Sequence, residues 1–435
     1  MRTGAAKTMG ERVRVLVSLL VVGVLIATST PAAIAAPPAA PGTGETLVSR
    51  VFETTLDGKP LSESGDQFYE VKIADFGTPR PGEVGAEKKA DPLPEVATGW
   101  DAAFEAECRD PARASQTGSA KGWTKNHYRW CRAVTVNWER STCNNGNCRV
   151  YALLAVQTIW LGYADARNRK FHIWGKTFDA VERLGSFEDD ARVGALAGCV
   201  AVRGKSSCSA YHQPAQLATL GDVKAKRNNV FETVLTDNSI IDLKLTGDAV
   251  VPVRIHSRFT GVGGAGHAGE TFQLDSDHVE SRCDSVKLRS KKACVFHNVS
   301  PYLTYDKNDT AYPLGDLIDH IRHAQNQLGA PGRWDNGGPD GPPLTRVRDA
   351  KIQRDNRKRP KAQCRQANPG GWNWRIQQCD EYPFASVREG GASGGPVSGR
   401  LISATHNREG GTQLNNWYNW DRVLHDDTFW VNLVG

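Results

Sequence analysis

Two adjacent carboxylates, Asp380 and Glu381, lie between Cys379 and a Tyr382-Pro383 turn, in a region rich in Arg and Lys. Carboxylate oxygens are ligands for hard divalent cations such as Mg²⁺, and cationic side chains bind the phosphate backbone of a nucleic acid. An acidic pair in basic surroundings therefore favours a metal ion held against a phosphate. The alternative is a pair of solvated surface acids, which is the ordinary state of an Asp-Glu dipeptide.

A run of basic residues precedes this pair. Between positions 346 and 365 nine basic residues stand against Asp349 and Asp355. The run is either a flexible charged loop or a rim that binds phosphate, and its position just before the acidic pair favours the rim. The basic residues are Arg346, Arg348, Lys351, Arg354, Arg357, Lys358, Arg359, Lys361 and Arg365. We expect four arginines to contact phosphates, because a guanidinium binds them in a bidentate fork: Arg346, Arg357, Arg388 and Arg408.

The elements that position the acidic pair are predicted from apolar spacing. Leu317, Ile318, Ile321 and Ala324 recur at helical spacing and predict a helix over residues 316–327. Further along, the pattern predicts a strand that ends at the carboxylates, a second strand, a helix and a last strand. Their expected ranges are 375–379, 399–404, 412–424 and 429–433.

This order places amides near the acids. Asn407, Asn415 and Asn416 lie at or in the expected helix, and the sequence strand, loop, strand, helix is typical of metal-dependent ββα nucleases. Hydrolysis of a phosphodiester needs a base that activates water and a cation that neutralises the developing charge. Carboxylate and amide oxygens suit Mg²⁺, Mn²⁺ or Ca²⁺ better than soft ions.

Several segments resemble the NucA/NucB family of secreted bacterial deoxyribonucleases. They are CDEYPFAS at 379–386, EGG at 389–391, Asn407-Arg408 with Gly410-Gly411, and the closing segment 422–431. Upstream, residues 344–346, Asn356-Arg357 and the helix that carries His320 are also similar. The resemblance covers residues 313–435 and no more of the chain.

The resemblance implies a compact, metal-dependent and sequence-nonspecific endonuclease of the ββα-metal type, similar to a His-Me finger, with Mg²⁺ or Mn²⁺ as the ion. Asp380 takes the place of the usual histidine base, although Asp380 and Glu381 could exchange roles. Glu381 or Glu389 supports the ion, Asn407 supplies an amide to it, and Asn416 is a weaker candidate ligand. DNA is the expected substrate.

Two positions depart from the family pattern. His406 stands where the family often has Asp, and it is a substitute base, a phosphate donor or a surface side chain. The segment 393–396 (SGGP) follows EGG where the family pattern does not predict it.

That segment belongs to a rival interpretation. Residues 391–396 (GASGGP) resemble the nucleophile loop of trypsin-like serine proteases, with Ser393 as the nucleophile. A protease also needs a histidine in an Ala-Ala-His-Cys-like setting, and none of the eleven histidines has that context. A second alternative is a non-catalytic binding protein for acidic polymers, with tryptophans that stack on bases: Trp372, Trp374, Trp417, Trp420 and Trp430.

The N-terminus predicts export. Residues 1–36 have the pattern of a signal peptide: four basic residues, an apolar core over 15–26 and a small-residue cleavage site at 33–35. We therefore expect a secreted, extracellular protein that does not span a membrane and has no obligate protein partner.

The ten cysteines all follow this segment, and their even number favours disulfides in an oxidising compartment. No Cys-x-x-Cys set predicts a zinc site. Sequential pairing is expected, although spacing does not prove connectivity, with the pairs Cys108 and Cys131, Cys143 and Cys148, Cys199 and Cys208, Cys283 and Cys294, and Cys364 and Cys379.

The chain as a whole is expected to be α+β. Residues 37–100 form a Pro/Gly-rich segment with a strand over 68–73, and residues 101–305 form a β-rich, disulfide-containing domain of unknown role. Short β-type runs separated by turn residues predict either a β-sandwich or two small β modules there. The runs are 133–138, 149–160, 230–235, 240–245 and 250–255.

Overall fold

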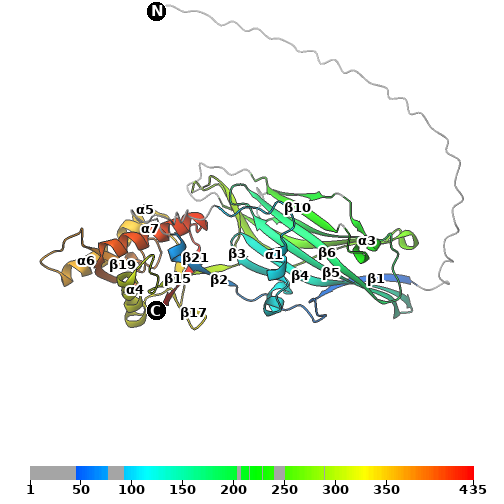
Figure 1. The fold of residues 1–435 in the computed structure, drawn as a ribbon, viewed down its shortest axis with the longest axis horizontal. Helices are drawn as coiled ribbons and strands as arrows, with labels where there is room; N and C mark the ends of the chain where they lie inside the picture. The colour runs from blue at the N-terminus through cyan, green and yellow to red at the C-terminus, as the bar shows by residue number, and fades with distance from the viewer. Residues whose placement is uncertain are drawn as a thin grey trace, which may run out of the picture. The chain divides into compact units, whose positions relative to one another are not determined.

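Long antiparallel strands build one part of the protein, and a mixed sheet with helices builds another (Figure 1). The computed structural model describes residues 46–76, 93–202, 207–214, 216–227, 229–239, 250–288 and 290–435. The expected signal peptide over residues 1–36 and the expected strand over residues 240–245 lie outside the described residues. Within the described ranges, no helix is both long and apolar enough to cross a membrane.

The secondary structure of the described residues is mostly strand. The strands are β1 (Thr46–Thr54), β2 (Phe68–Lys72), β3 (Trp123–Asn126), β4 (Arg129–Asn144), β5 (Asn147–Ala164), β6 (Lys170–Leu184), β7 (Arg192–Ala201), β8 (Cys208–Gln213), β9 (Ala218–Thr219), β10 (Val230–Asp237), β11 (Val250–Val262), β12 (Thr271–Asp275), β13 (Val279–Asp284), β14 (Ala293–Phe296), β15 (Ser300–Asp306), β16 (Arg333–Asp335), β17 (Gly338–Asp340), β18 (Leu344–Thr345), β19 (Gln377–Tyr382), β20 (Ser398–Ser403) and β21 (Thr428–Val434). The α-helices are α1 (Ala102–Cys108), α2 (Ala114–Thr117), α3 (Leu220–Lys224), α4 (Gly315–Leu328), α5 (Ala350–Asn356), α6 (Lys358–Ala367) and α7 (Ala404–Trp420). Short 3-10 helices are η1 (Ile73–Phe76), η2 (Pro111–Arg113), η3 (Ala265–His267) and η4 (Gly391–Ser393).

Two antiparallel sheets share one apolar core and form a β-sandwich. The seven-stranded sheet has the order β1-β4-β5-β6-β10-β8, with β3 beside β4. The six-stranded sheet has the order β14-β13-β11-β7-β9, with β12 beside β11. Buried side chains of both sheets, such as Trp160 on β5 and Phe259 on β11, belong to one core cluster. The sandwich is therefore the correct one of the two arrangements expected from the sequence.

Alternating side chains explain why these strands form. Partly buried and buried positions alternate along the whole of β10, as expected for a strand with one face on a core. The described strands expected from the sequence fall within β4, β5, β10 and β11. The two sheets also come close at Gly175 on β6, where a Cβ would lie 2.0 Å from the carbonyl oxygen of Ala195 on β7.

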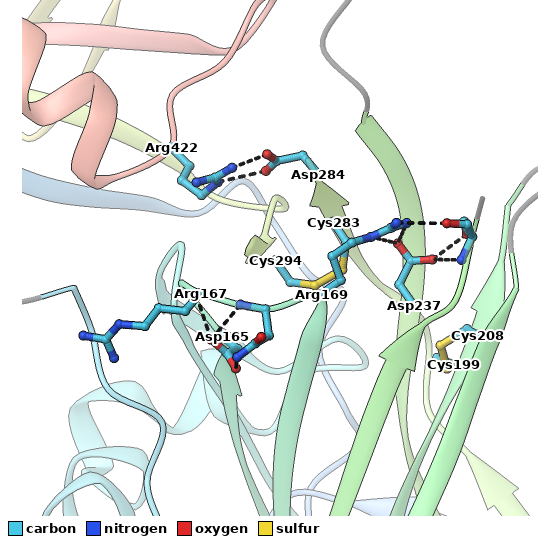
Figure 2. The surroundings of a disulfide bond; sticks show 12 residues. Asp165, Arg167, Arg169, Cys199, Cys208, Asp237, Cys283, Asp284, Cys294 and Arg422 are labelled. Carbon is cyan, nitrogen blue, oxygen red and sulfur yellow. Dashed lines mark hydrogen bonds and ion pairs between the residues drawn. A yellow bond between two sulfur atoms is a disulfide. The ribbon is translucent and has the colours of Figure 1, made fainter. Parts of the chain in front are cut away.

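Five disulfides join the cysteines in the predicted sequential order. Four of them involve elements of the β-sandwich region: Cys108–Cys131, Cys143–Cys148, Cys199–Cys208 and Cys283–Cys294. Figure 2 shows the last of these, which joins β13 to β14. The fifth, Cys364–Cys379, ties α6 to β19, the strand that carries Asp380 and Glu381.

A third sheet supports the C-terminal part of the chain. Its order is β17-β16-β21-β15-β2, with β18 beside β21. Ile318 of α4 and Trp417 of α7 share a separate core with Leu303 of β15 and Val431 of β21. This sheet takes β15 from residues that the sequence assigned to the β-rich domain, and β2 from the Pro/Gly-rich segment.

β19 and β20 form a two-stranded antiparallel sheet that is followed directly by α7. Figure 1 shows α4, α6 and α7 gathered around it, and all three helices contact its strands. Two glycines allow this packing. A Cβ on Gly399 would lie 2.2 Å from the carbonyl oxygen of Pro360, and one on Gly410 would lie 2.3 Å from Leu317 Cδ2.

Two expected boundaries in this region were wrong. The first strand does not end at the carboxylates, because β19 stays paired with β20 as far as Tyr382 and Ser398. The helix expected over residues 412–424 begins earlier, at Ala404. The helix includes Gly410 and Gly411, and Gly410 packs closely against Leu317 of α4.

The basic run is helical and not a loop. It folds into α5 and α6, which follow each other almost without a break. Asp349 caps α5 by accepting hydrogen bonds from the backbone amides of Lys351 and Ile352, which satisfies amides that have no partner inside a helix. The basic side chains are therefore carried on an ordered scaffold.

Candidate active site

A cavity of about 210 Å³ lies where β19, α5 and α7 meet. Asp380 and Glu381 of β19 line it together with Arg346 and Arg357. Asn407 also lines it. The structure therefore brings these five predicted site residues together around one cavity.

The two carboxylates leave β19 on opposite sides. Successive side chains of a strand point to opposite faces, so Gln378, Asp380 and Tyr382 share one face while Cys379 and Glu381 share the other. The contacts agree with this division. Asp380 contacts α4 through a histidine, whereas Cys379 is bonded to α6. The two acids thus reach the cavity from different directions.

Asp380 is held by a short chain of buried polar groups. Its Oδ2 lies 2.6 Å from His320 Nδ1, and His320 Nε2 lies 2.9 Å from Ser398 Oγ. His320 is fully buried and Asp380 is 7% exposed. Such a chain fixes the orientation of the carboxylate, because each member is itself hydrogen-bonded.

Glu381 has an unusual protonation equilibrium. Burial, and after it the charge of Asp380, raise the pKa of Glu381 from 4.5 to about 7, against the opposing charges of Arg357 and Lys361. Its Oε1 lies 3.3 Å from Arg357 Nε. A nearby cation stabilises the ionised form of a carboxylate most when that carboxylate is buried and lies beside another acid.

The three asparagines separate into two groups. Asn407 and Asn415 line the cavity, and Asn407 Nδ2 donates a hydrogen bond to Gln378 Oε1 at 3.0 Å. Asn416 Nδ2 instead donates to the carbonyl oxygen of Phe76 on η1. Neighbouring helix residues point about 100° apart, so Asn416 lies away from the cavity and does not meet the expectation of a metal ligand.

The expected phosphate-binding arginines also fall into two groups, those that line the cavity and those that do not. The Arg346 guanidinium lies 3.9 Å from the centroid of the Tyr418 ring and donates to the carbonyl oxygens of Val347 and Ser386. Arg388 is exposed, pairs with Asp426 and is not part of the cavity lining.

Three further expected residues lie outside the lining of the cavity. Arg408 is exposed. Glu389 Oε2 accepts a hydrogen bond from the backbone amide of Thr345 at 2.8 Å. His406 Nδ1 accepts one from the backbone amide of Asp316 at 3.3 Å. The contacts of Glu389 and His406 join neighbouring loops and helix ends, so the structure does not bring these residues to the acids.

Ser393 lies in a turn of its own loop. Its hydroxyl donates to the carbonyl oxygen of Glu389 at 3.2 Å and accepts from the amide of Gly395 at 3.2 Å. Both partners are backbone groups of the same loop. This contact pattern is that of a turn side chain and does not resemble a serine activated by histidine.

Residues 336–432 match the model of the family Deoxyribonuclease NucA/NucB. The C-terminal segment carries a NucA/NucB nuclease domain. The curated proteins and the solved structures gave no match. The match implies deoxyribonuclease activity for this segment, which contains the cavity residues Asp380, Glu381, Arg346, Arg357, Asn407 and Asn415.

The matched segment makes contacts with residues that precede it. His320 on α4 precedes the matched segment, yet it contacts Asp380. From the sequence, His320 was not predicted to lie beside the acids. The usable signal was its position between Leu317 and Ile321, which puts a titratable group on the buried face of the helix. Ser398 and Gln378 carried no comparable signal.

The donors of the nuclease domain fit a hard divalent cation. Within the described residues, no group of three or more His, Cys, Asp or Glu side chains could hold a metal ion by itself. Mg²⁺ does not need such a cage, because it keeps several waters and uses one or two carboxylates plus substrate phosphates. Two carboxylates beside amides, with a raised pKa at Glu381, match that requirement.

Proposed function

We propose that the chain is a secreted, metal-dependent endonuclease that hydrolyses DNA phosphodiester bonds with little base preference. The observation that carries this proposal is the cavity in which Asp380 and Glu381 meet Arg346 and Arg357. The family match supports DNA as the substrate. Contacts to phosphate position a nucleic acid without reading its sequence, which is why little base preference is expected.

Asp380 is the general base in this proposal. His320 and Ser398 orient its carboxylate, so that it accepts a proton from the water molecule that attacks phosphorus. This role is the one that histidine has in ββα-metal nucleases. The succession of β19, β20 and α7 supports a ββα-metal fold for the domain.

Asp380, Glu381 and Asn407 would hold Mg²⁺ or Mn²⁺ through oxygen atoms. The ion would supply charge neutralisation at the phosphate and the leaving oxygen. Arg346 and Arg357 would bind phosphate oxygens beside it. Residues outside the cavity receive no part in this chemistry, and these are Glu389, Asn416, His406, Arg388 and Arg408.

Secretion is part of the same proposal. Five disulfides form and persist best in an oxidising environment, and residues 1–36 have the composition of a signal peptide. The chain would be exported, cleaved after this segment and oxidised before it meets DNA.

Digestion of plasmid DNA by the purified protein tests the proposal. We expect cleavage with Mg²⁺ or Mn²⁺, no cleavage with EDTA, and recovery when the metal is restored in excess. Casein incubated under the same conditions should remain intact. Casein cleavage that a serine-directed inhibitor stops would instead establish the protease, and Ser393→Ala would then abolish it.

A further inference from the structure

The loop between α7 and β21, residues 421–427, is held by the β-sandwich through two Arg–Asp pairs. Arg282 of β13 donates to both carboxylate oxygens of Asp427. Arg422 of the loop donates in turn to both carboxylate oxygens of Asp284, also on β13. Each side therefore supplies one cation and one anion. Figure 2 shows Arg422 facing Asp284, which follows the disulfide-bonded Cys283 directly.

Both pairs are buried. Asp284 is fully buried and Arg422 is 1% exposed, and Arg422 also donates to the carbonyl oxygen of Val286 at 3.0 Å. Arg282 Nη2 donates to the carbonyl oxygen of Arg422 at 2.9 Å. Paired charges in a buried site tolerate little displacement, because removal of one partner leaves the other charge without compensation.

The start of the loop is also fixed by the sandwich. Tyr128 donates its hydroxyl to the carbonyl oxygen of Trp420 at 2.7 Å, and His127 Nδ1 donates to that of Asp421 at 2.7 Å. The loop is therefore held along its length, and its position depends on residues far outside the matched family segment.

The same loop holds Arg346 at the cavity. The amide of Arg346 donates to the carbonyl oxygen of Asp427 at 2.8 Å, and the amide of Asp426 donates to the carbonyl oxygen of Arg346 at 2.9 Å. Asp427 thus joins the two parts: its side chain contacts Arg282 on the sandwich, and its backbone contacts Arg346. The Arg346 side chain lines the cavity with Asp380.

We propose that Arg282 and Asp284 are positioning residues for Arg346, and that the β-sandwich is thereby an integral part of the DNA-binding site. The inference rests on the proposed function, because it assigns Arg346 to phosphate. A sandwich that served only as a separate binding module would not need buried, reciprocal ion pairs with the loop that is hydrogen-bonded to Arg346.

A double-mutant cycle in the full-length chain separates positioning from general destabilisation. The variants are Asp284→Asn, Arg346→Ala and the combination. Glu280→Gln is the matched control, since Glu280 forms an exposed pair with Arg254 on the same face of strands β11 and β13. We expect Asp284→Asn to raise KM for duplex DNA about tenfold, and by less than about twofold when Arg346 is already Ala.

Equal increases in KM in both backgrounds, or an increase as large for Glu280→Gln, would overturn the inference. Should Asp284→Asn not yield folded protein, Arg282→Lys replaces it in the cycle with the same two outcomes. A wild-type chain that does not cut DNA would defeat the proposed function, and with it the assignment of Arg346 to phosphate.

Hydrogen exchange gives a readout that does not depend on DNA. The Arg346 amide should exchange faster in Asp284→Asn than in the wild type, because it donates to the carbonyl oxygen of Asp427 in the loop 421–427. Its exchange rate should not change in Glu280→Gln. Unchanged exchange at Arg346 in Asp284→Asn would show that β13 does not position this residue.

Discussion

The β-sandwich and the nuclease domain both bury charged side chains, but they use them differently. In the sandwich, Arg140 is 1% exposed and lies between Glu188 and Glu270, so each charge faces its opposite. In the nuclease domain, Asp380 and Glu381 are close enough that one acid raises the pKa of the other, and both line a cavity. Burial of charge alone therefore does not identify a site.

The two regions differ in how accessible their charged side chains are and in whether opposite charges face one another. In the sandwich, opposite charges face one another, with Arg140 in contact with two acids, as expected for structural ions. The cavity is open and holds neighbouring like charges, which is the arrangement found where a metal or a substrate completes the balance. The following substitutions test this distinction, in order of decreasing expected effect, and Asp380 itself is tested last.

His320→Ala should lower kcat for DNA cleavage about 100-fold, because Asp380 loses the partner that orients it. Ser398→Ala should have a smaller effect, since Ser398 contacts Asp380 only through His320. Both values are measured on protein shown to be folded by circular dichroism. Equal kcat in wild type and His320→Ala would show that His320 does not orient Asp380 for catalysis.

Glu270→Gln should lower the stability of the fold and leave the cleavage rate unchanged. Trp138 Nε1 and Arg140 Nε donate to Glu270 at 2.7 and 2.9 Å, and loss of its charge should lower the free energy of unfolding by about 2 kcal/mol. The cleavage rate per folded molecule should not change. Denaturant unfolding and a cleavage assay on one preparation check both, and a lost rate with intact stability would erase the contrast between the regions.

Glu381 predicts a pH dependence for the metal-free chain. Between an unfolded pKa near 4.5 and a folded pKa of about 7, the folded state keeps a proton that the unfolded state has lost. Stability should therefore fall as pH rises through this window. Urea unfolding in EDTA at pH 5 and pH 8 should show this fall in wild type and a smaller one in Glu381→Gln. Identical pH slopes would show that Glu381 titrates normally.

The smallest effect is expected for Arg388→Ala. Arg388 is exposed and pairs with an exposed Asp426, and such pairs contribute little. KM for DNA should change less than about twofold, against about tenfold for Arg346→Ala in the cavity. A larger change for Arg388 than for Arg346 would move the phosphate-binding surface away from the cavity.

Local patterns predicted much of the fold. The alternation of apolar residues located β10, and the helical spacing of Leu317 and Ile321 located α4 within one residue at each end. Cysteine order predicted all five disulfides, because the two cysteines of each pair lie only 5 to 23 residues apart in the sequence. These features depend on residues close together in the sequence.

Long-range contacts could not be predicted in the same way. His320 and Asp380 are 60 residues apart, and the sequence between them does not encode their contact as a local pattern. The addition of β2 to the C-terminal sheet beside β15 is a still longer connection. The start of α7 at Ala404 could not be predicted either, because glycine is a poor helix former and the contact of Gly410 with Leu317 is long-range.

Single-turnover cleavage of one end-labelled DNA duplex by wild type and by Asp380→Asn is the most direct measurement. With Mg²⁺ present, we expect the wild type to cut the duplex and Asp380→Asn to be slower by about 1,000-fold, with unchanged thermal stability. A variant that cuts within about threefold of the wild-type rate would show that Asp380 is not the base.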